Sequence, residues 1–309
     1  MGDTITVEIT SKGLGISSGE QEVWNVFSDR YLDGCGHQDF YKNMTRDLPE
    51  ETNVRLHINN RGELTRLYIL YSEGSDKRFS FNRSFKGKKV SHISADVVGM
   101  QDRGVSKIAN RNLFNFYLQC GLEKASIKVG DIGVYAWGRV GFVPNSNGWN
   151  NIKYLVEKRL DFLEANPSVE DGPLPNSLVE PIRKVLSSPD AKNYWFIVDQ
   201  EYSYHGLSLG KLLTLPIDKL PEKILDIYDF DGDFNDDCYE VNEFENPDYD
   251  TFEGSFQERA DWSGSFDLSS SSDSMKRFNA YIEASGLEPV RGPVNKKAPV
   301  LPKVASFGG

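Results

Sequence analysis

The stretch "VGMQDRGVSKIANRNLFNFYLQCGL", residues 98–122, passes from a short apolar run through a polar turn into an amphipathic helix. Apolar side chains recur after Gly104 at helical spacing, which predicts a helix over 106–120 that packs on one face of a sheet. The side chains that we expect to be buried are Val105, Ile108, Leu113, Phe116 and Leu118. Arg111 and Asn115 lie on the polar stripe, so we expect both to face solvent.

Gly104 stands between the apolar run and the helix, and it admits two interpretations. A glycine permits a backbone turn that other residues enter only with strain. The same turn would also present backbone N–H groups at a helix N-terminus, where the partial positive charge attracts phosphate. The sequence is compatible with a plain turn and with a phosphate-binding loop.

The residues around this stretch predict an α/β protein. Alternation of apolar and polar residues predicts strands at 4–10, 78–85, 90–100 and 124–130 and a hairpin over 53–74. Helical spacing predicts helices at 19–32 and 134–141, the second followed by a strand from Phe142. This order of elements indicates a mixed sheet flanked by helices.

The second half of the chain predicts more helix and one further strand. Helices are expected at 150–166, 177–186 and 274–286, the last ended by Gly286. The run "YWFIVDQ", residues 194–200, indicates a buried strand. We therefore expect a core over 1–148, a helical insertion over 149–190, strands that return to the core over 191–217, an acidic aromatic-rich extension over 218–286 and a Pro-rich arm over 287–309.

The net charge of −11 is unevenly distributed along the chain. Residues 218–273 hold 18 acidic residues against Lys219, Lys223 and Arg259, a balance of −15, so the rest of the chain carries +4. Phosphates would be repelled by this region, which makes nucleic acid a poor partner for it. We expect its aromatic residues and acids to become ordered against a basic neighbouring protein subunit, with a solvated loop as the alternative.

The sequence gives little support for a membrane span, a disulfide framework, a metal site or a calcium loop. No apolar run is long enough to span a membrane. The three cysteines and four histidines are scattered, so we expect no disulfide framework and no metal site. The acidic stretch 229–240 resembles a calcium loop, but Phe234 occupies the position that requires glycine.

The spacing Q-x-x-G-x-small in "QDRGVS", residues 101–106, resembles the pyrophosphate loop of the GNAT acetyltransferases. The ordered elements "ISADVVGM", "QDRGVS", "KIANRNLFNFYLQCGL", "KASIKVG" and "YAWGRVGF" appear in the family's order at plausible lengths. The resemblance covers residues 4–143 and implies a GNAT-like mixed sheet that binds acetyl-coenzyme A.

The resemblance also assigns residues to the cofactor. Backbone groups of Val97, Val98 and Gly99 would pair with the pantetheine arm. Lys107 would add charge to the pyrophosphate, which backbone N–H groups of the loop would hold, among them those of Gln101, Arg103, Gly104 and Ser106. The family usually has Gly or Ala where this chain has Ser106.

Acetyl transfer needs a base for the ammonium group and often an acid for the departing thiolate. Asp96, on the strand before the loop, is the first candidate for the base and His92 is the second; either residue would also suit a solvent-facing strand position. The family's acid is a tyrosine at the position of Trp137, which has no proton of useful acidity. Tyr135 is the candidate acid that remains, although it lies about 200° around the helix from that position, and both aromatic residues also suit a core.

The ending "W-x-G-x-x-D-L", residues 262–268, with "MKRFNAYI" resembles the tail of GNAT-like domains of bacteriophage particle proteins. It implies an internal structural or assembly component of a tailed phage, located in the bacterial cytoplasm or in the particle. The alternative is an active N-acetyltransferase that depends on acetyl-coenzyme A, and a third possibility is an acyl-coenzyme A sensor without turnover. Whether the chain is an enzyme stays open from sequence alone.

Overall fold

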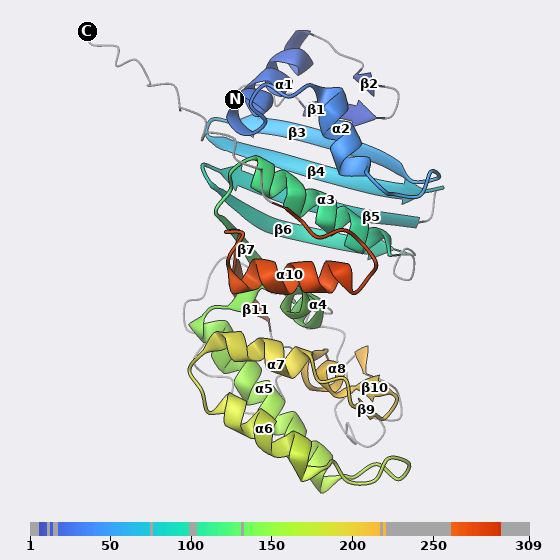
Figure 1. Ribbon diagram of the computed structural model, residues 1–309, viewed down its shortest axis with the longest axis vertical. Coiled ribbons are helices and arrows are strands. Elements are labelled where there is room, and N and C mark those ends of the chain that lie inside the picture. Colours follow the sequence, from blue (N-terminus) through green and yellow to red (C-terminus); the bar gives the residue numbers. More distant parts are fainter. Residues whose placement is uncertain are drawn as a thin grey trace, which may run out of the picture. The chain divides into compact units, whose positions relative to one another are not determined.

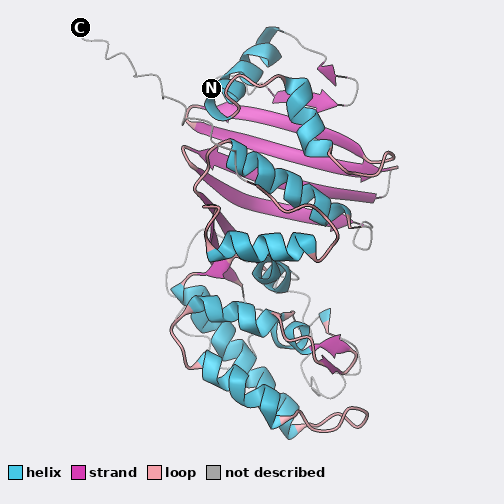
Figure 2. Ribbon diagram, viewed as in Figure 1, coloured by secondary structure: helices cyan, strands magenta, loops and turns pink. Residues whose placement is uncertain are grey.

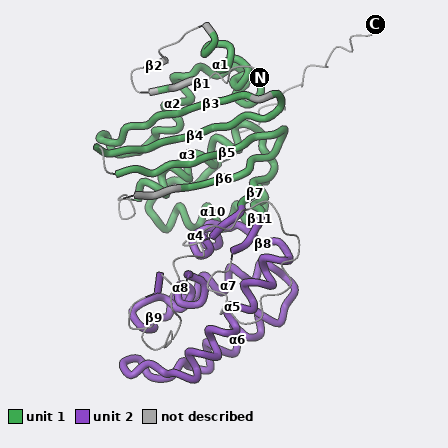
Figure 3. The backbone as a smooth tube through the Cα atoms, turned by 180° about the vertical axis from the view of Figure 1, so that it is seen from behind, with its two compact units in different colours: residues 1–127, 265–309 green, residues 128–264 purple. Residues whose placement is uncertain are grey.

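The computed structural model describes residues 6–10, 13–14, 18–74, 77–98, 104–130, 133–216, 219–220 and 261–291. The chain forms two compact units (Figure 3). Unit 1 comprises Met1–Ile127 and Ser265–Gly309, and unit 2 comprises Lys128–Gly264. The boundaries of these two units differ from the domain boundaries that we expected at residues 148 and 218.

Unit 1 contains a mixed sheet of seven strands, as the sequence predicted in coarse form. The strands follow the order β2 (Gly13–Leu14), β1 (Thr6–Thr10), β3 (Asn53–Arg61), β4 (Leu64–Glu73), β5 (Lys77–Lys86), β6 (Lys89–Val98) and β7 (Lys124–Val129). Every neighbouring pair is antiparallel except β6 and β7, which are parallel. The expected hairpin is confirmed, because β3 and β4 pair over their whole length around a turn at Gly62 and Glu63.

Four helices of unit 1 cover one face of this sheet (Figure 1): α1 (Ser18–Tyr31), α2 (His37–Thr45), α3 (Val105–Gln119) and α10 (Asp273–Glu283). Figure 2 separates these helices from the strands by colour. Seen from behind, strands β3 to β6 are not covered by these helices (Figure 3). The alternation of burial along β4 agrees, since Leu67, Ile69 and Tyr71 are buried while Arg66 and Tyr68 are exposed.

Aromatic side chains fill the space between the sheet and the helices. Phe85 of β5 lies 5.5 Å from Tyr31 of α1 and 5.8 Å from Phe116 of α3, measured between ring centroids. On another side of α3, Phe114 stacks on Phe278 of α10 at 4.2 Å. The helix therefore has neighbours on more than one side, which explains why α3 buries polar as well as apolar residues.

The prediction of a strand at 194–200 is wrong, and so is the prediction that 191–217 forms strands that return to the core. Residues Tyr194–Val198 form the helix α7, which follows a 3₁₀ turn at Ala191–Asn193, and Leu209–Thr214 form the helix α8. Only β9 (Ser203–Tyr204) and β10 (Leu207–Ser208) are extended there, in a two-stranded sheet of their own. A short apolar run has no periodicity that distinguishes a buried strand from a buried helix.

The remaining elements of unit 2 are largely those expected. They are α4 (Gly133–Val140), β8 (Val143–Pro144), α5 (Ser146–Ala165) and α6 (Asn176–Leu186). β11 (Trp262–Asp267) runs across the boundary between the units. The part of the acidic extension that is described is thus folded as β11 and α10, whereas 221–260 and the arm over 292–309 lie outside the described residues. Over the described part of the chain, no helix combines the length and apolar character needed to cross a membrane.

Candidate functional site

The predicted cofactor loop lies between the end of β6 and the start of α3. Gly99, Gln101 and Arg103 lie outside the described residues, and so do the side chains of Asp96, Val97 and Val98. The assignments of these six residues therefore stay predictions. The described residues of this seam are the strand backbone up to Val98 and the helix from Gly104 onward.

Gly104 has the left-handed conformation, with φ +69° and ψ −3°, and it is the N-cap of α3. Its carbonyl oxygen accepts hydrogen bonds from the N–H groups of Lys107 (3.0 Å) and Ile108 (3.3 Å). A side chain at this position would meet no atom within 4 Å, so the need for glycine is a need of the backbone conformation. The turn interpretation of Gly104 accounts for this geometry without a ligand.

Two other residues of the predicted loop begin α3. Ser106 is half-buried in the first turn of the helix. The ammonium group of Lys107 lies 5.3 Å from the centroid of the Tyr281 ring on α10, a cation–π distance. Lys107 thus has an aromatic neighbour within unit 1.

The parallel strands β6 and β7 pair only over their first part. The paired residues run from Lys89 with Lys124 to His92 with Ile127. A β-bulge lies at the same place, because Arg83 pairs with His92 and Asn82 with Ser94, which leaves Ile93 without a partner on β5. Beyond this point β6 continues to Val98, and Ile93 is 47% exposed. The pairing between β6 and β7 therefore ends at His92.

A fully buried arginine holds the bulge. Nη1 of Arg83 donates to the carbonyl oxygens of Ser94 (2.8 Å) and Asn82 (2.9 Å), and Nε donates to the Tyr117 hydroxyl oxygen (3.2 Å). Its guanidinium carbon lies 4.3 Å from the centroid of the Phe81 ring. Burial lowers the pKa of Arg83, while the nearby tyrosines Tyr117 and Tyr71 act in the opposite direction.

His92, the second candidate for the base, lies inside the same cluster. It is 4% exposed, and its Nε2 atom lies 3.0 Å from the Tyr117 hydroxyl oxygen. Burial, and then the positive charge of Arg83, lower the pKa of His92 well below its ordinary value. The imidazole is therefore neutral near pH 7, and its Nε2 atom shares a hydrogen bond with the Tyr117 hydroxyl group, which accepts one from Arg83. In this position His92 supports the sheet and does not face solvent.

Tyr135 and Trp137 belong to unit 2, on α4. The ring of Tyr135 has two cations near it, the guanidinium carbon of Arg139 at 6.0 Å and the ammonium of Lys211 at 5.8 Å from its centroid. The ring of Trp137 lies 5.3 Å from that of Phe142, so Trp137 is an aromatic packing residue of unit 2. Tyr135 thus lies near two cations, and Trp137 packs against Phe142.

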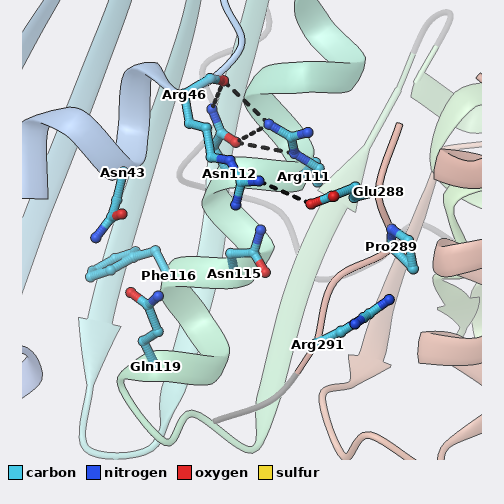
Figure 4. A pocket seen from close by; sticks show the side chains of 10 residues that line it. All are labelled: Asn43, Arg46, Arg111, Asn112, Asn115, Phe116, Gln119, Glu288, Pro289 and Arg291. Carbon is cyan, nitrogen blue, oxygen red and sulfur yellow. Dashed lines mark hydrogen bonds and ion pairs between the residues drawn. The ribbon is translucent and has the colours of Figure 1, made fainter. Parts of the chain in front are cut away.

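A pocket of about 250 Å³ lies in unit 1 between α2, α3 and the segment that follows α10 (Figure 4). Its lining is polar and comprises Asn43, Arg46, Arg111, Asn112, Asn115, Phe116, Gln119, Glu288, Pro289 and Arg291. Guanidinium and carboxamide groups donate hydrogen bonds to carboxylate or phosphate oxygens, so this lining suits a small anion better than an apolar ligand. Two of its three guanidinium groups are already paired, Arg46 with Glu288 (2.9 Å) and Arg111 with Asp47 (2.8 Å).

The expectation that Arg111 faces solvent is wrong, since Arg111 is 2% exposed. Its Nη2 atom donates to Asn112 Oδ1 (2.8 Å) and to the carbonyl oxygen of Arg46 (3.2 Å), in addition to the ion pair with Asp47. The carbonyl groups at the end of α2 have no helical partners, and Arg111 and Asn112 supply donors for them. Asn115, the other residue expected to be exposed, is half-buried.

Comparison with known proteins adds no relative: no family model, no curated protein and no solved structure matches the chain. Within the described residues, no group of three or more His, Cys, Asp or Glu side chains could hold a metal ion. The functional interpretation therefore depends on the geometry given above.

Sequence reasoning missed the cluster of Arg83, Tyr117 and His92, although a signal for it was present. In "RFSFNRSF" the residues Phe79, Phe81 and Phe85 alternate on one face of the strand, and Arg83 occupies an inward position in the same series. An arginine at an inward strand position indicates a buried polar group that needs partners. Its partners, the bulge carbonyl and Tyr117, could not be read from the sequence.

Proposed function

We propose that this protein is a GNAT-like structural or assembly component of a tailed-phage particle, and not an efficient acetyltransferase. The observation that supports it is the buried, neutral state of His92 in its hydrogen bond with Tyr117. A general base must reach the proton that it removes, and a side chain enclosed between sheet and helix does not. Trp137 at the position of the family's tyrosine supports the same conclusion, because its indole is packed against Phe142 and offers no acidic proton.

The assembly role has a second component, the acidic region. We propose that residues 218–273 contact other protein subunits through their excess of 15 negative charges. Localisation to the bacterial cytoplasm or to the particle follows from this proposal. Within this region β11 contributes the buried aromatic residue Phe266 to unit 1.

The second candidate function is acetyl transfer. Acetyl-coenzyme A would be held by the backbone of β6 and by N–H groups near Gly104, and Asp96 would act as the base directly or through water. Two observations support this candidate, the end of the β6–β7 pairing at His92 and the helix N-terminus at Gly104.

Release of coenzyme A thiol from acetyl-coenzyme A over a panel of primary amines separates the two candidates. The assembly proposal predicts release at the rate without protein. Steady release that is lost in Asp96→Ala and retained in Tyr135→Phe would overturn the assembly proposal and identify an acetyltransferase that works without a tyrosine acid. Circular dichroism of both variants controls for misfolding.

A further inference from the structure

The face of the unit 1 sheet that the helices leave uncovered (Figure 3) carries a set of exposed cations. The exposed cations that point to this face are Arg55, Arg66, Arg78, Lys86, Lys89 and Lys124. Among the outward-facing residues of β3 to β6 whose side chains are described, none is acidic. We call these six residues, together with Tyr68 and His57, the basic face.

The strand register places three of these cations side by side. Lys86 of β5 pairs with Lys89 of β6, and Lys89 pairs with Lys124 of β7. The next residues on the same face, Ser91 and Ser126, form a hydrogen bond between their hydroxyl groups at 3.0 Å, which confirms that the two strands present this row to the same side. Like charges directly opposite each other destabilise a sheet, so an anionic partner would relieve a cost that the isolated protein carries.

Two of the six cations, Arg55 and Arg78, have partners elsewhere in the protein, whereas others of the set have little or no neutralisation. Arg66 and Lys89 have no ion pair with a described residue, and the contact of Lys86 with Glu63 is long at 3.9 Å between highly exposed side chains. Asp96 lies opposite Ser80 in the register, at the rim of the face, and its side chain is not described. The face thus keeps several unneutralised cations around a central aromatic pair.

That pair consists of Tyr68, 37% exposed, and His57, which lies directly opposite on β3 at 5.9 Å between ring centroids. A partner that fits this face carries many negative charges and aromatic rings, because rings stack on Tyr68 while acids pair with the cations around it. Residues 221–260 of this chain have this composition, with 14 acidic residues, two basic residues and eight aromatic residues.

We infer that the basic face of one molecule binds the acidic aromatic segment 221–260 of a second copy, so that copies assemble by unlike surfaces. The segment is assigned to a second copy because the proposed role of the protein is association between subunits. Contact between two unlike surfaces of identical subunits builds a ring or a filament, or a symmetric dimer when two copies exchange their segments. The inference deepens the proposed assembly role and rests on it, but its test involves no coenzyme A, so the two proposals fail separately.

The first test measures binding of a fluorescent peptide of residues 226–253, which holds 12 acidic and no basic residues, to the full-length protein by fluorescence anisotropy. The Arg66→Ser/Lys89→Ser variant is expected to bind the peptide about fivefold to tenfold more weakly than wild type, because two exposed attractions are removed. The matched control is Lys42→Ser/Lys276→Ser, which removes two exposed charges of unit 1 from α2 and α10. Equal losses in both variants would show an unspecific charge effect and overturn the inference.

A second measurement tests the source of the segment. Sedimentation velocity of the full-length protein at low salt should show association that grows with concentration, weakens as NaCl screens the charges, and decreases in Arg66→Ser/Lys89→Ser. A protein that stays monomeric over the accessible concentrations would overturn the inference, as would tight binding of a single-stranded oligonucleotide to the same face with no binding of the peptide. A peptide in which Asn and Gln replace Asp and Glu should not bind.

Discussion

Arg83 combines full burial with hydrogen bonds to the β-bulge, to Tyr117 and, through Tyr117, to His92. A buried guanidinium is costly unless its donors are paired, and here two carbonyl groups and a hydroxyl group accept from Nη1 and Nε, while Nη2 has no hydrogen-bond partner among the described residues. The same side chain keeps His92 neutral, because its charge adds to the effect of burial. One residue thus fixes the shape of β6 at Ile93 and removes a titratable group from the candidate site.

The neutral state of His92 predicts that acid destabilises the protein. Below pH 6.5 the histidine of the unfolded chain takes up a proton that the folded protein excludes, so the free energy of unfolding should fall as the pH drops from 6.5 toward 5. The slope from this residue is at most about 1.4 kcal/mol per pH unit. Urea unfolding of wild type and His92→Gln at several pH values measures it, and equal pH dependence in both proteins would contradict the assignment.

Arg111 joins α3 to the end of α2, and its loss should cost stability. Arg111→Leu removes one of the two donors to the Arg46 carbonyl oxygen and leaves Asp47 with only its longer ion pair to Arg46 (3.5 Å), so we expect the free energy of unfolding to fall by about 2–4 kcal/mol. Gln119→Ala, at an exposed position of the same helix, is the matched control and should change it by less than about 0.5 kcal/mol. Urea denaturation measures both, and a loss in Arg111→Leu no larger than in the control would contradict the assigned role.

The connection from β6 to α3 depends on the conformation of Gly104. Because φ is +69°, Gly104→Ala should destabilise the protein by about 1 kcal/mol. Gly104→Asn should cost less, since asparagine enters the left-handed region more easily. Chemical denaturation of wild type and of both variants should give this order of stability if the left-handed turn conformation is the reason for glycine at this position. Equal stability of all three would show that the conformation is not required.

In unit 2, α4 and α7 approach closely at Gly138. A Cβ atom at this position would lie 2.5 Å from the ring of Tyr194, whose hydroxyl group donates to the Val134 carbonyl oxygen of α4. Gly138→Ala should therefore reduce the free energy of unfolding by about 1–3 kcal/mol. Ala136→Ser, which adds one atom on the exposed side of α4, should change it by less than about 0.5 kcal/mol. Thermal unfolding of Gly138→Ala identical to that of Ala136→Ser would exclude the steric clash.

The elements that sequence predicted well are those with a clear period. The alternation in β3 to β6 and the stripe of Ile152, Leu155, Val156, Leu160 and Leu163 on α5 are each one-sided, and the structure buries these faces. The nine-residue helix α2 was missed because it buries only Phe40 and Met44, too few to show a pattern. The burial of Arg111 could not be predicted, since it depends on Asp47 and the carbonyl groups of another element.

The candidate site was predictable in outline only. The order of strand, turn and helix around Gly104 followed from local pattern, and so did the glycine conformation. The state of His92 did not, because it is set by Arg83 and Tyr117, which lie nine residues before it and 25 residues after it in the chain. Long-range contacts determine whether a titratable residue faces solvent or the core, and a single sequence does not contain them.

For the molecule as a whole, two properties support the proposed assembly role over catalysis. The pairing of β6 with β7 ends at His92, and this histidine is enclosed and neutral. The charge of the chain divides into an acidic region of −15 and a remainder of +4. Under this proposal the fold serves association between subunits, and coenzyme A binds weakly or not at all.

Calorimetric titration of acetyl-coenzyme A into the full-length protein tests this interpretation most directly. The account predicts no measurable heat of binding, or a dissociation constant weaker than about 0.1 mM. A dissociation constant in the micromolar range that is weakened by substitution near the end of the β6–β7 pairing, such as Ile93→Trp, would contradict it and restore the acetyltransferase.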